Sequence, residues 1–105
     1  MPISLLLLAA AVLPPRAGEI FGDVRVGDTY VADAPIQLTC GADTVRGKTA
    51  ADGSFRLATK SGGKCIVTIT HQQANVSVEV IVFDKPARYR LMLEQKDGAW
   101  ILKRV

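Results

Sequence analysis

The stretch TAADGSFRLATKSGGKCIVTI, Thr49 to Ile69, decides the fold of this chain. It predicts a strand that ends at an Asp-Gly turn, a second strand over Ser54–Thr59, a Gly-Gly turn and a third strand that begins at Cys65. Gly, Pro and Asp-Gly interrupt the rest of the chain as often, and β-branched residues dominate between them. We therefore expect an all-β protein with no helix after Ala17.

Short strands at near-regular spacing predict a small antiparallel β-sandwich of about seven to eight strands. Asn75–Phe83 carries valines at every second place, and this strand is long and apolar enough to lie centrally in its sheet. Asp-Gly pairs at 52–53 and 97–98 are explained by tight turns, the second of which closes a C-terminal hairpin over 94–105. The expected strands are Glu19–Val26, Pro35–Cys40, Thr44–Ala50, Ser54–Thr59, Cys65–Thr70, Asn75–Phe83, Ala87–Glu94 and Ala99–Lys103.

The two cysteines are expected to form one disulfide. Cys40 ends a strand in which every second residue is apolar, and Cys65 begins another, so both thiols point to the core side. If the two strands pair antiparallel with the cysteines opposite each other, one register aligns the whole apolar face. A disulfide fits a small exported domain with a limited core. The pairs in that register are Cys40–Cys65, Leu38–Val67 and Ile36–Ile69.

Residues 1–17 match a signal peptide. Leu5–Leu13 is an apolar run of nine residues, too short to cross about 30 Å of hydrocarbon as a helix but typical of the hydrophobic region of a signal peptide cleaved after Ala17. A mispredicted start or a short buried strand is the alternative. We expect a secreted or periplasmic protein without a membrane span, in which residues 18–105 form one domain.

Positive charge is concentrated near the C-terminus. The net charge is +3, but Lys85–Val105 holds six basic and two acidic residues, a net charge of +4. Such a segment either faces an anionic partner or is simply a solvated strand face. Aromatic residues lie among these cations, and Tyr30, in the loop 27–34, is a further aromatic that could be exposed. The candidate binding surface is Arg88, Tyr89, Arg90, Trp100, Lys103 and Arg104.

Four short motifs together suggest a family. Gly22-Asp-Val24 and Ala32–Leu38 (ADAPIQL) look like two opening strands, Thr49–Phe55 (TAADGSF) like a T-(D)-x-D/N-G-x-F/Y turn, and Gly63–Ile69 (GKCIVTI) like a G-x-Y-x-L-x-V strand. In these motifs the chain resembles the carboxypeptidase regulatory-like domains, which are small transthyretin-like (prealbumin-like) β-sandwiches.

Two positions depart from the family pattern. Ala50 stands where an acidic residue is common, and Cys65 stands where an aromatic residue is usual, so a core disulfide replaces that ring. The resemblance implies an accessory domain of the kind found beside peptidases, receptors or surface proteins. Because one fold serves many roles, it does not name a ligand.

No catalytic residue, metal site or cofactor is predicted. His71 is the only histidine, and no triad or metal-ligand spacing surrounds it, so we interpret it as a polar residue in the turn after a strand. A transthyretin-like hydrolase of a ureide needs several histidines and arginines and a C-terminal tetrapeptide ending in Gly-Ser, whereas this chain ends Lys103-Arg104-Val105. The sequence therefore predicts that the protein is not an enzyme.

The sequence instead predicts an accessory or binding module that contacts a protein through a sheet edge or the C-terminal hairpin. One alternative is a carbohydrate or cell-envelope-polymer binder that uses Trp100, Tyr89 and the nearby arginines. Trp100 shares a strand face with Leu102, so it either covers the sandwich edge or stays exposed for such a ligand. A small secreted enzyme inhibitor is another alternative. A nucleic-acid partner is not expected, because an exported protein works outside the compartment that holds nucleic acid and because the arginines are too few to follow a phosphate backbone.

Overall fold

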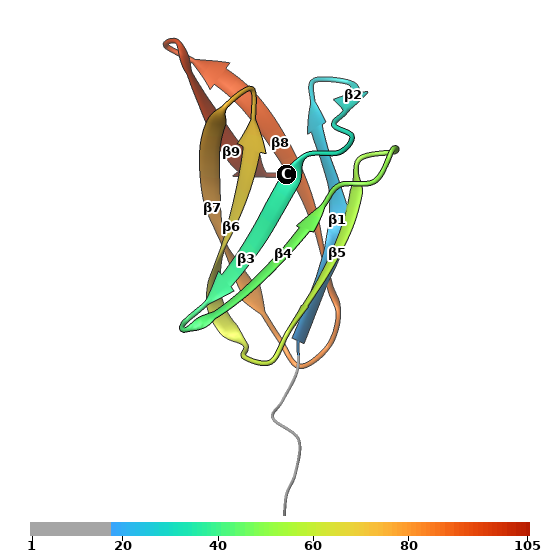
Figure 1. Ribbon diagram of the computed structural model, residues 1–105, viewed down its shortest axis with the longest axis vertical. Coiled ribbons are helices and arrows are strands. Elements are labelled where there is room, and N and C mark those ends of the chain that lie inside the picture. The colour runs from blue at the N-terminus through green and yellow to red at the C-terminus, as the bar shows by residue number, and fades with distance from the viewer. Residues whose placement is uncertain (1–17) are drawn as a thin grey trace, which may run out of the picture.

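A computed structural model describes residues 18–105, which form two β-sheets packed face to face (Figure 1). The predicted signal peptide, residues 1–17, lies outside the described residues. No part of residues 18–105 is a helix long and apolar enough to cross a membrane. The strands are β1 (Gly18–Val26), β2 (Thr29–Tyr30), β3 (Pro35–Cys40), β4 (Asp43–Lys48), β5 (Ser54–Thr59), β6 (Gly63–His71), β7 (Ala74–Val82), β8 (Ala87–Lys96) and β9 (Ala99–Arg104).

The first sheet runs in the order β4-β3-β6-β7 and is antiparallel throughout. In the second sheet β1 is central, with β5 and the short β2 on one side and β8, followed by β9, on the other. The predicted sandwich is thus confirmed, with nine strands rather than seven to eight. One pairing differs from the prediction, because β1 and β8 run parallel, with Ile20 opposite Ala87.

The core lies between the two sheets, where alternate residues of each strand point inward. Residues from five strands of both sheets bury their side chains completely. Mainly polar residues occupy the intervening positions, so each sheet has an apolar inner face and a largely polar outer face. The fully buried hydrophobic residues are Ile20, Val24, Leu38, Val67, Ile69, Val80, Leu91 and Leu93.

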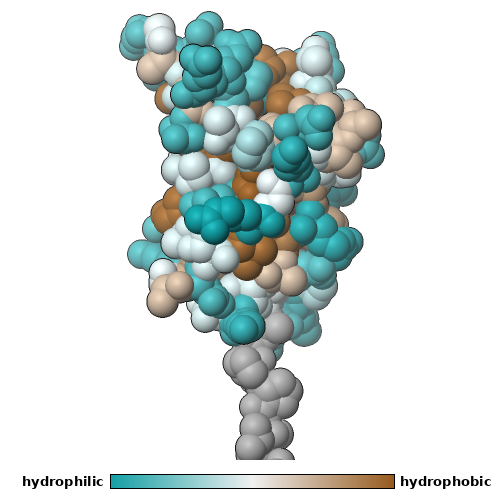
Figure 2. All heavy atoms as spheres, in the orientation of Figure 1, coloured by the Kyte–Doolittle hydropathy of each residue, from teal (hydrophilic) through white to brown (hydrophobic). Residues whose placement is uncertain are grey.

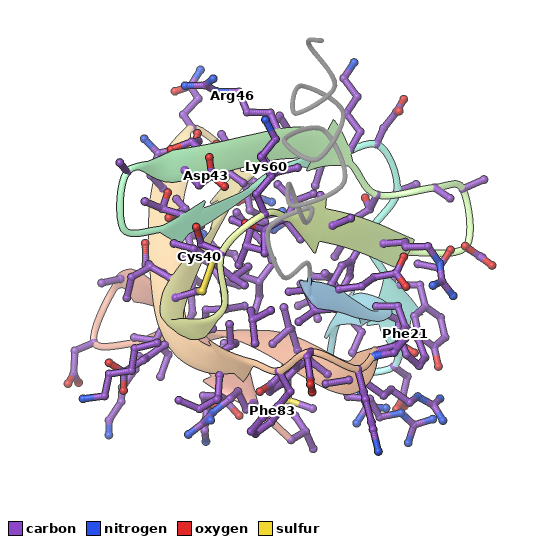
Figure 3. All side chains as sticks on the ribbon, turned by 90° about the horizontal axis from the view of Figure 1, so that it is seen from below. Phe21, Cys40, Asp43, Arg46, Lys60 and Phe83 are labelled. Atoms are coloured by element: carbon purple, nitrogen blue, oxygen red, sulfur yellow. A yellow bond between two sulfur atoms is a disulfide. The ribbon has the colours of Figure 1, made fainter. Side chains whose placement is uncertain are left out.

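The disulfide joins the central strands of the first sheet. Cys40 and Cys65 are bonded, with their Cα atoms 4.4 Å apart, and both side chains are buried. Figure 3 shows the sulfur–sulfur bond at Cys40 inside the sandwich. Strand β3 pairs with β6 in the predicted register, in which Leu38 faces Val67 and Ile36 faces Ile69. Both the pairing of the cysteines and the register of their strands are confirmed.

Strand β7 is an edge strand, which contradicts its predicted central position. Its valines point into the core as expected, but its outward side chains include Ser77 and Glu79. A strand with only one apolar face can end a sheet, because its outer face and its free edge both tolerate water. Beyond this edge β7 packs against β9 of the other sheet.

The strand expected over Thr44–Ala50 ends at Lys48, because Thr49 holds the neighbouring loop. The buried Thr49 hydroxyl donates a hydrogen bond to the Val31 carbonyl oxygen (2.7 Å) and accepts one from the Ala34 N–H (2.9 Å). A buried hydroxyl with both bonds made fixes a loop that has little secondary structure of its own. This loop contains β2, which the sequence did not predict.

Both Asp-Gly turns form, but only the turn at 97–98 closes the expected hairpin, because β4 and β5 on either side of Asp52–Gly53 belong to different sheets. Gly53 has a φ of 80°, and Asp52 accepts hydrogen bonds from the Ser54 hydroxyl (2.6 Å) and N–H (3.0 Å). Both bonds lower the pKa of the Asp52 carboxyl, and the bond from the Ser54 hydroxyl has the larger effect. Asp97 and Gly98 both have positive φ, as a two-residue hairpin turn requires. The hairpin at that turn begins earlier than residue 94, since Leu91 already pairs with Arg104.

Candidate functional site

Three of the six predicted surface residues share one face. The even-numbered residues of β8, which include Arg88 and Arg90, alternate with the buried Leu91 and Leu93 and so point outward. Met92 points outward with them and pairs with Lys103 of β9. Two further cations, Arg25 and Arg56, lie on this outer face from β1 and β5. We call the set the basic face; it consists of Phe21, Arg25, Arg56, Arg88, Arg90, Met92 and Lys103, and Glu19 and Asp23 lie on the same outer side of β1.

An aromatic ring lies in the basic face. Phe21 is half-buried on the outer side of β1, and the Arg56 guanidinium carbon is 4.9 Å from the centre of its ring. The strand register places Arg56 on one side of Phe21 and Arg88 on the other. The Arg56 guanidinium also binds the Glu19 carboxylate at 2.8 Å. Cation–π contact and ion pair together orient Arg56 along the ring.

Positive charge on the basic face is only partly neutralised. Lys103 binds Glu94 at 3.2 Å and Arg56 binds Glu19, which accounts for two of the five cations. Within residues 18–105 no carboxylate lies within ion-pair distance of Arg25, Arg88 or Arg90. Arginine is well suited to bind carboxylates in two-point contact. The face therefore offers unpaired guanidinium groups beside an apolar ring.

Tyr89 points to the opposite side of β8 and joins the two sheets. Its hydroxyl donates to the Ile81 carbonyl oxygen (2.7 Å) and accepts from the Ile81 N–H (3.0 Å). The half-buried ring packs against the core. Tyr89 therefore satisfies both backbone groups of a residue on the free edge of β7, and its hydroxyl is already engaged within the fold.

This role gives a first expected result. Tyr89→Phe lowers the free energy of unfolding by about 1–2 kcal/mol, because Ile81 loses both partners. Tyr30→Phe is the matched control, since Tyr30 is 46% exposed and its hydroxyl makes no hydrogen bond within residues 18–105. Urea denaturation of the two variants and the wild type measures the difference. Equal stability of all three proteins would mean that the Tyr89 hydroxyl does not hold the edge.

Trp100 and Arg104 lie on the other side of β9 from Lys103. The indole is half-buried against the core and meets His71 edge to face, with ring centres 4.7 Å apart. His71 is the last residue of β6, so this contact links the ends of two strands in different sheets. Arg104 is exposed opposite Leu91. The six predicted residues thus occupy two sides of the hairpin and do not form one patch.

The described residues show no metal-binding cluster. In residues 18–105 no group of three or more His, Cys, Asp or Glu side chains could hold a metal ion. His71 contacts an aromatic ring, and every buried side-chain nitrogen or oxygen atom of these residues has a hydrogen-bond partner. The polar side chains that could contact a ligand therefore lie on the surface.

The fold is the transthyretin-like β-sandwich. No protein-family model matches the chain, and no curated protein matches it. Among solved structures, 5-hydroxyisourate hydrolase of Klebsiella pneumoniae is similar, with a TM-score of 0.56, 15% identity, and coverage of 84% of this chain and 98% of the hydrolase. A "putative cell adhesion protein" of Bacteroides fragilis is also similar, with a TM-score of 0.52, 10% identity and coverage of 86% of this chain. The chain spans 45% of that second protein.

The hydrolase corrects one prediction. From the lone histidine and the C-terminal residues, the sequence predicted that the chain is not an enzyme. This prediction is wrong, because a similar structure, 98% of which is covered by this chain, is a hydrolase. At 15% identity the likeness shows the fold alone. The finer resemblance to carboxypeptidase regulatory-like domains stays a prediction.

Sequence reasoning missed Phe21, Arg25 and Arg56 as members of the basic face. Alternation within Gly18–Val26 does place Phe21 and Arg25 on the outer side of their strand. What brings them beside Arg88 is the pairing of β1 with β8, whose paired residues are distant in sequence. The local pattern predicts which way these side chains point, but it does not predict which strands lie beside them.

Proposed function

We propose that the protein is an exported binding module whose basic face contacts an acidic surface of a protein partner. The observation that carries this proposal is the set of unpaired cations Arg25, Arg88 and Arg90 on the face that also holds the half-buried Phe21. Complementary charge guides such a partner and fixes its orientation, and an apolar ring at one end of the face adds contact area.

Export is part of the same proposal. Residues 1–17 match a signal peptide, and the buried disulfide is a bond that persists in oxidising compartments. The turn at Asp52–Gly53 and the strand pairs on either side of it support assignment to the carboxypeptidase regulatory-like domains, whose signature lies at that turn. Such domains act beside other proteins of the cell surface, as the resemblance implies.

A protein partner is favoured over an envelope polysaccharide at the C-terminal hairpin. Stacking on a sugar requires an exposed indole, but Trp100 is half-buried and covered in part by His71. The Tyr89 hydroxyl is bonded to Ile81. Both aromatic residues that a sugar would need are therefore engaged in the sandwich.

Charge reversal tests the proposal. The tagged protein is purified from the envelope fraction of its own host at low salt, and its partner is identified and its dissociation constant measured. We expect Arg88→Glu/Arg90→Glu to weaken this complex at least about tenfold, and binding to the wild type to fall steeply as salt rises. Lys60→Glu/Lys64→Glu is the matched control, because it changes the net charge equally at a loop and on the other sheet.

The control decides the interpretation. Loss of the partner in both double variants would mean that net charge matters and the basic face does not. Retention in both would place the interface elsewhere. A retained polysaccharide in place of a protein would support the alternative function.

A further inference from the structure

The outer face of the first sheet holds a hollow that neither the motifs nor the basic face explains. Its volume is about 340 Å³, at the lower end of the range for ligand sites. Figure 2 looks onto this face, where teal and pale atoms of polar and weakly polar residues cover most of the surface and brown apolar atoms are visible between them. We call it the polar hollow; the residues used below are Pro35, Arg46, Lys48, Thr68, Thr70 and Asn75.

Strand register arranges these residues in two rows. Lys48 lies opposite Pro35, and Thr70 lies opposite Asn75, so β4, β3, β6 and β7 contribute one row in that order. The second row begins at Arg46, two residues from Lys48, and continues through Gln37 to Thr68, with Ser77 beside Thr68 just outside the lining of the hollow. With about 4.8 Å between strands, a row extends over roughly 14 Å. A ligand in the hollow therefore lies across the strands.

One end of the hollow is cationic. Arg46 and Lys48 are exposed on the outer side of β4, and within residues 18–105 no carboxylate lies within ion-pair distance of either. Figure 3 shows Arg46 pointing outward, on a different side of the sandwich from Phe21. Two unpaired cations at this spacing suit a carboxylate, which Arg binds through paired N–H groups.

The other end offers neutral hydrogen-bonding groups. The Thr70 hydroxyl donates to the Asn75 side-chain oxygen at 2.7 Å, and the Thr68 and Ser77 hydroxyls are 2.8 Å apart. These bonds hold the side chains in place while leaving the Asn75 NH₂ group and several hydroxyl lone pairs free for a ligand. Pre-arranged donors and acceptors side by side match the adjacent hydroxyls of a sugar ring.

Between the two ends lie two residues of β3, the apolar Pro35 in the first row and the polar Gln37 in the second. The Pro35 ring is exposed on β3, between Lys48 and the Thr70–Asn75 pair in the row. A rigid ring at this place can pack against the C–H groups of a pyranose without competing for its hydroxyls. A cation, an apolar ring and paired polar groups thus follow one another across the sheet.

We propose that the polar hollow binds a carboxylated saccharide, with a uronate carboxylate at Arg46 and Lys48 and ring hydroxyls at Thr70 and Asn75. The basic face belongs to the other sheet, and the two surfaces come nearest each other at Lys48, which also lines a hollow beside Phe21 and Arg56. An isolated phosphate would use only the cationic end, and an acidic peptide would not supply adjacent hydroxyls for the neutral end. A saccharide uses both.

The probe is an oligomer of galacturonic acid, with its fully methyl-esterified form as the neutral comparison. Titration of the ¹⁵N-labelled protein is followed by the backbone amide signals. We expect the signals of Lys48, Thr70 and Asn75 to shift, and Arg46→Gln/Lys48→Gln to raise the dissociation constant at least about tenfold. Lys60→Gln/Lys64→Gln removes the same charge elsewhere and should bind as the wild type does. Thr70→Val is the second variant and should weaken binding with both cations present.

Four results would overturn the proposal: no shift at saturating oligomer, equal binding by Arg46→Gln/Lys48→Gln, equal affinity for the methyl ester, or shifts confined to β1 and β8. Arg88→Glu/Arg90→Glu separates this site from the proposed protein interface, because that variant should keep the saccharide and lose the protein. Since Arg46 and Lys48 are exposed, their replacement should leave the thermal unfolding midpoint unchanged, which is checked on the same samples.

Discussion

Gly22→Ala is expected to lower the free energy of unfolding by about 3 kcal/mol or more, or to prevent folding. Gly22 lies in the central strand β1, opposite Tyr89 of β8 on one side and Phe55 of β5 on the other. A Cβ atom at this position would overlap the Tyr89 carbonyl oxygen. Because that oxygen belongs to the backbone, a flexible side chain cannot move aside to relieve the overlap. The parallel pairing of β1 with β8 would have to open.

Gly41→Ala is the control for this substitution. Gly41 has a φ of 60°, and a Cβ atom there would have no neighbour within 4 Å. The cost of a side chain in this left-handed conformation is about 1–2 kcal/mol. Urea denaturation followed by circular dichroism gives the free energy of unfolding of both variants. If Gly22→Ala were folded and no less stable than Gly41→Ala, the close approach of β1 to β8 would be contradicted.

Removal of the disulfide is the second large effect. Cys40→Ala/Cys65→Ala is expected to lower the free energy of unfolding by about 3 kcal/mol, because the bond closes a loop between residues 25 positions apart. A domain of this size has a total stability of roughly 4–13 kcal/mol, so the disulfide accounts for a large share. Replacement also leaves small voids at two buried positions.

A reducing agent distinguishes the bond from the voids. Wild-type protein, reduced and checked by mass spectrometry, should lose most of the stability that the double variant loses, and the double variant should not respond to the reductant. Urea denaturation with and without reductant measures both. Unchanged stability of fully reduced wild type would show that the disulfide does not stabilise the fold.

Much of the fold could be predicted because its signals are local. Alternation defined β3 and β5 to the residue, and the Asp-Gly turns follow from the conformations that these residues adopt. The register of β3 with β6 was predictable for a different reason. If the two strands pair antiparallel with their core-facing cysteines opposite each other, the same alignment also brings Leu38 opposite Val67, as the structure shows.

The order of strands was less predictable. The apolar face of β7 suggested a central strand, yet both an edge strand and a central strand of a sandwich have one buried face. The residues of β7 do not indicate whether a second strand pairs with its other edge. At that edge of β7 the Tyr89 hydroxyl forms hydrogen bonds with the backbone of Ile81. The sequence alone places Tyr89 in the candidate binding surface instead.

The basic face shows the same limit at the candidate site. Arg88 and Arg90 were predicted from the charge of their segment, whereas Phe21 and Arg56 reach the face through the pairings of β1. Charge along the chain can be counted from residues, but a surface depends on which strands are neighbours. The same limit applies to Trp100, because its partner His71 comes from the other sheet.

The parallel pairing of β1 with β8 also bears on the order of folding. Ile20 of the first strand meets Ala87, which is 67 positions later in the chain. Contacts between such distant residues form slowly, because a long loop must close before they stabilise anything. The central strand can pair early with β5, but its other side stays open until β8 has been synthesised. The last stage of folding therefore depends on residues at both ends of the domain, and a growing chain remains incompletely folded until it is nearly complete.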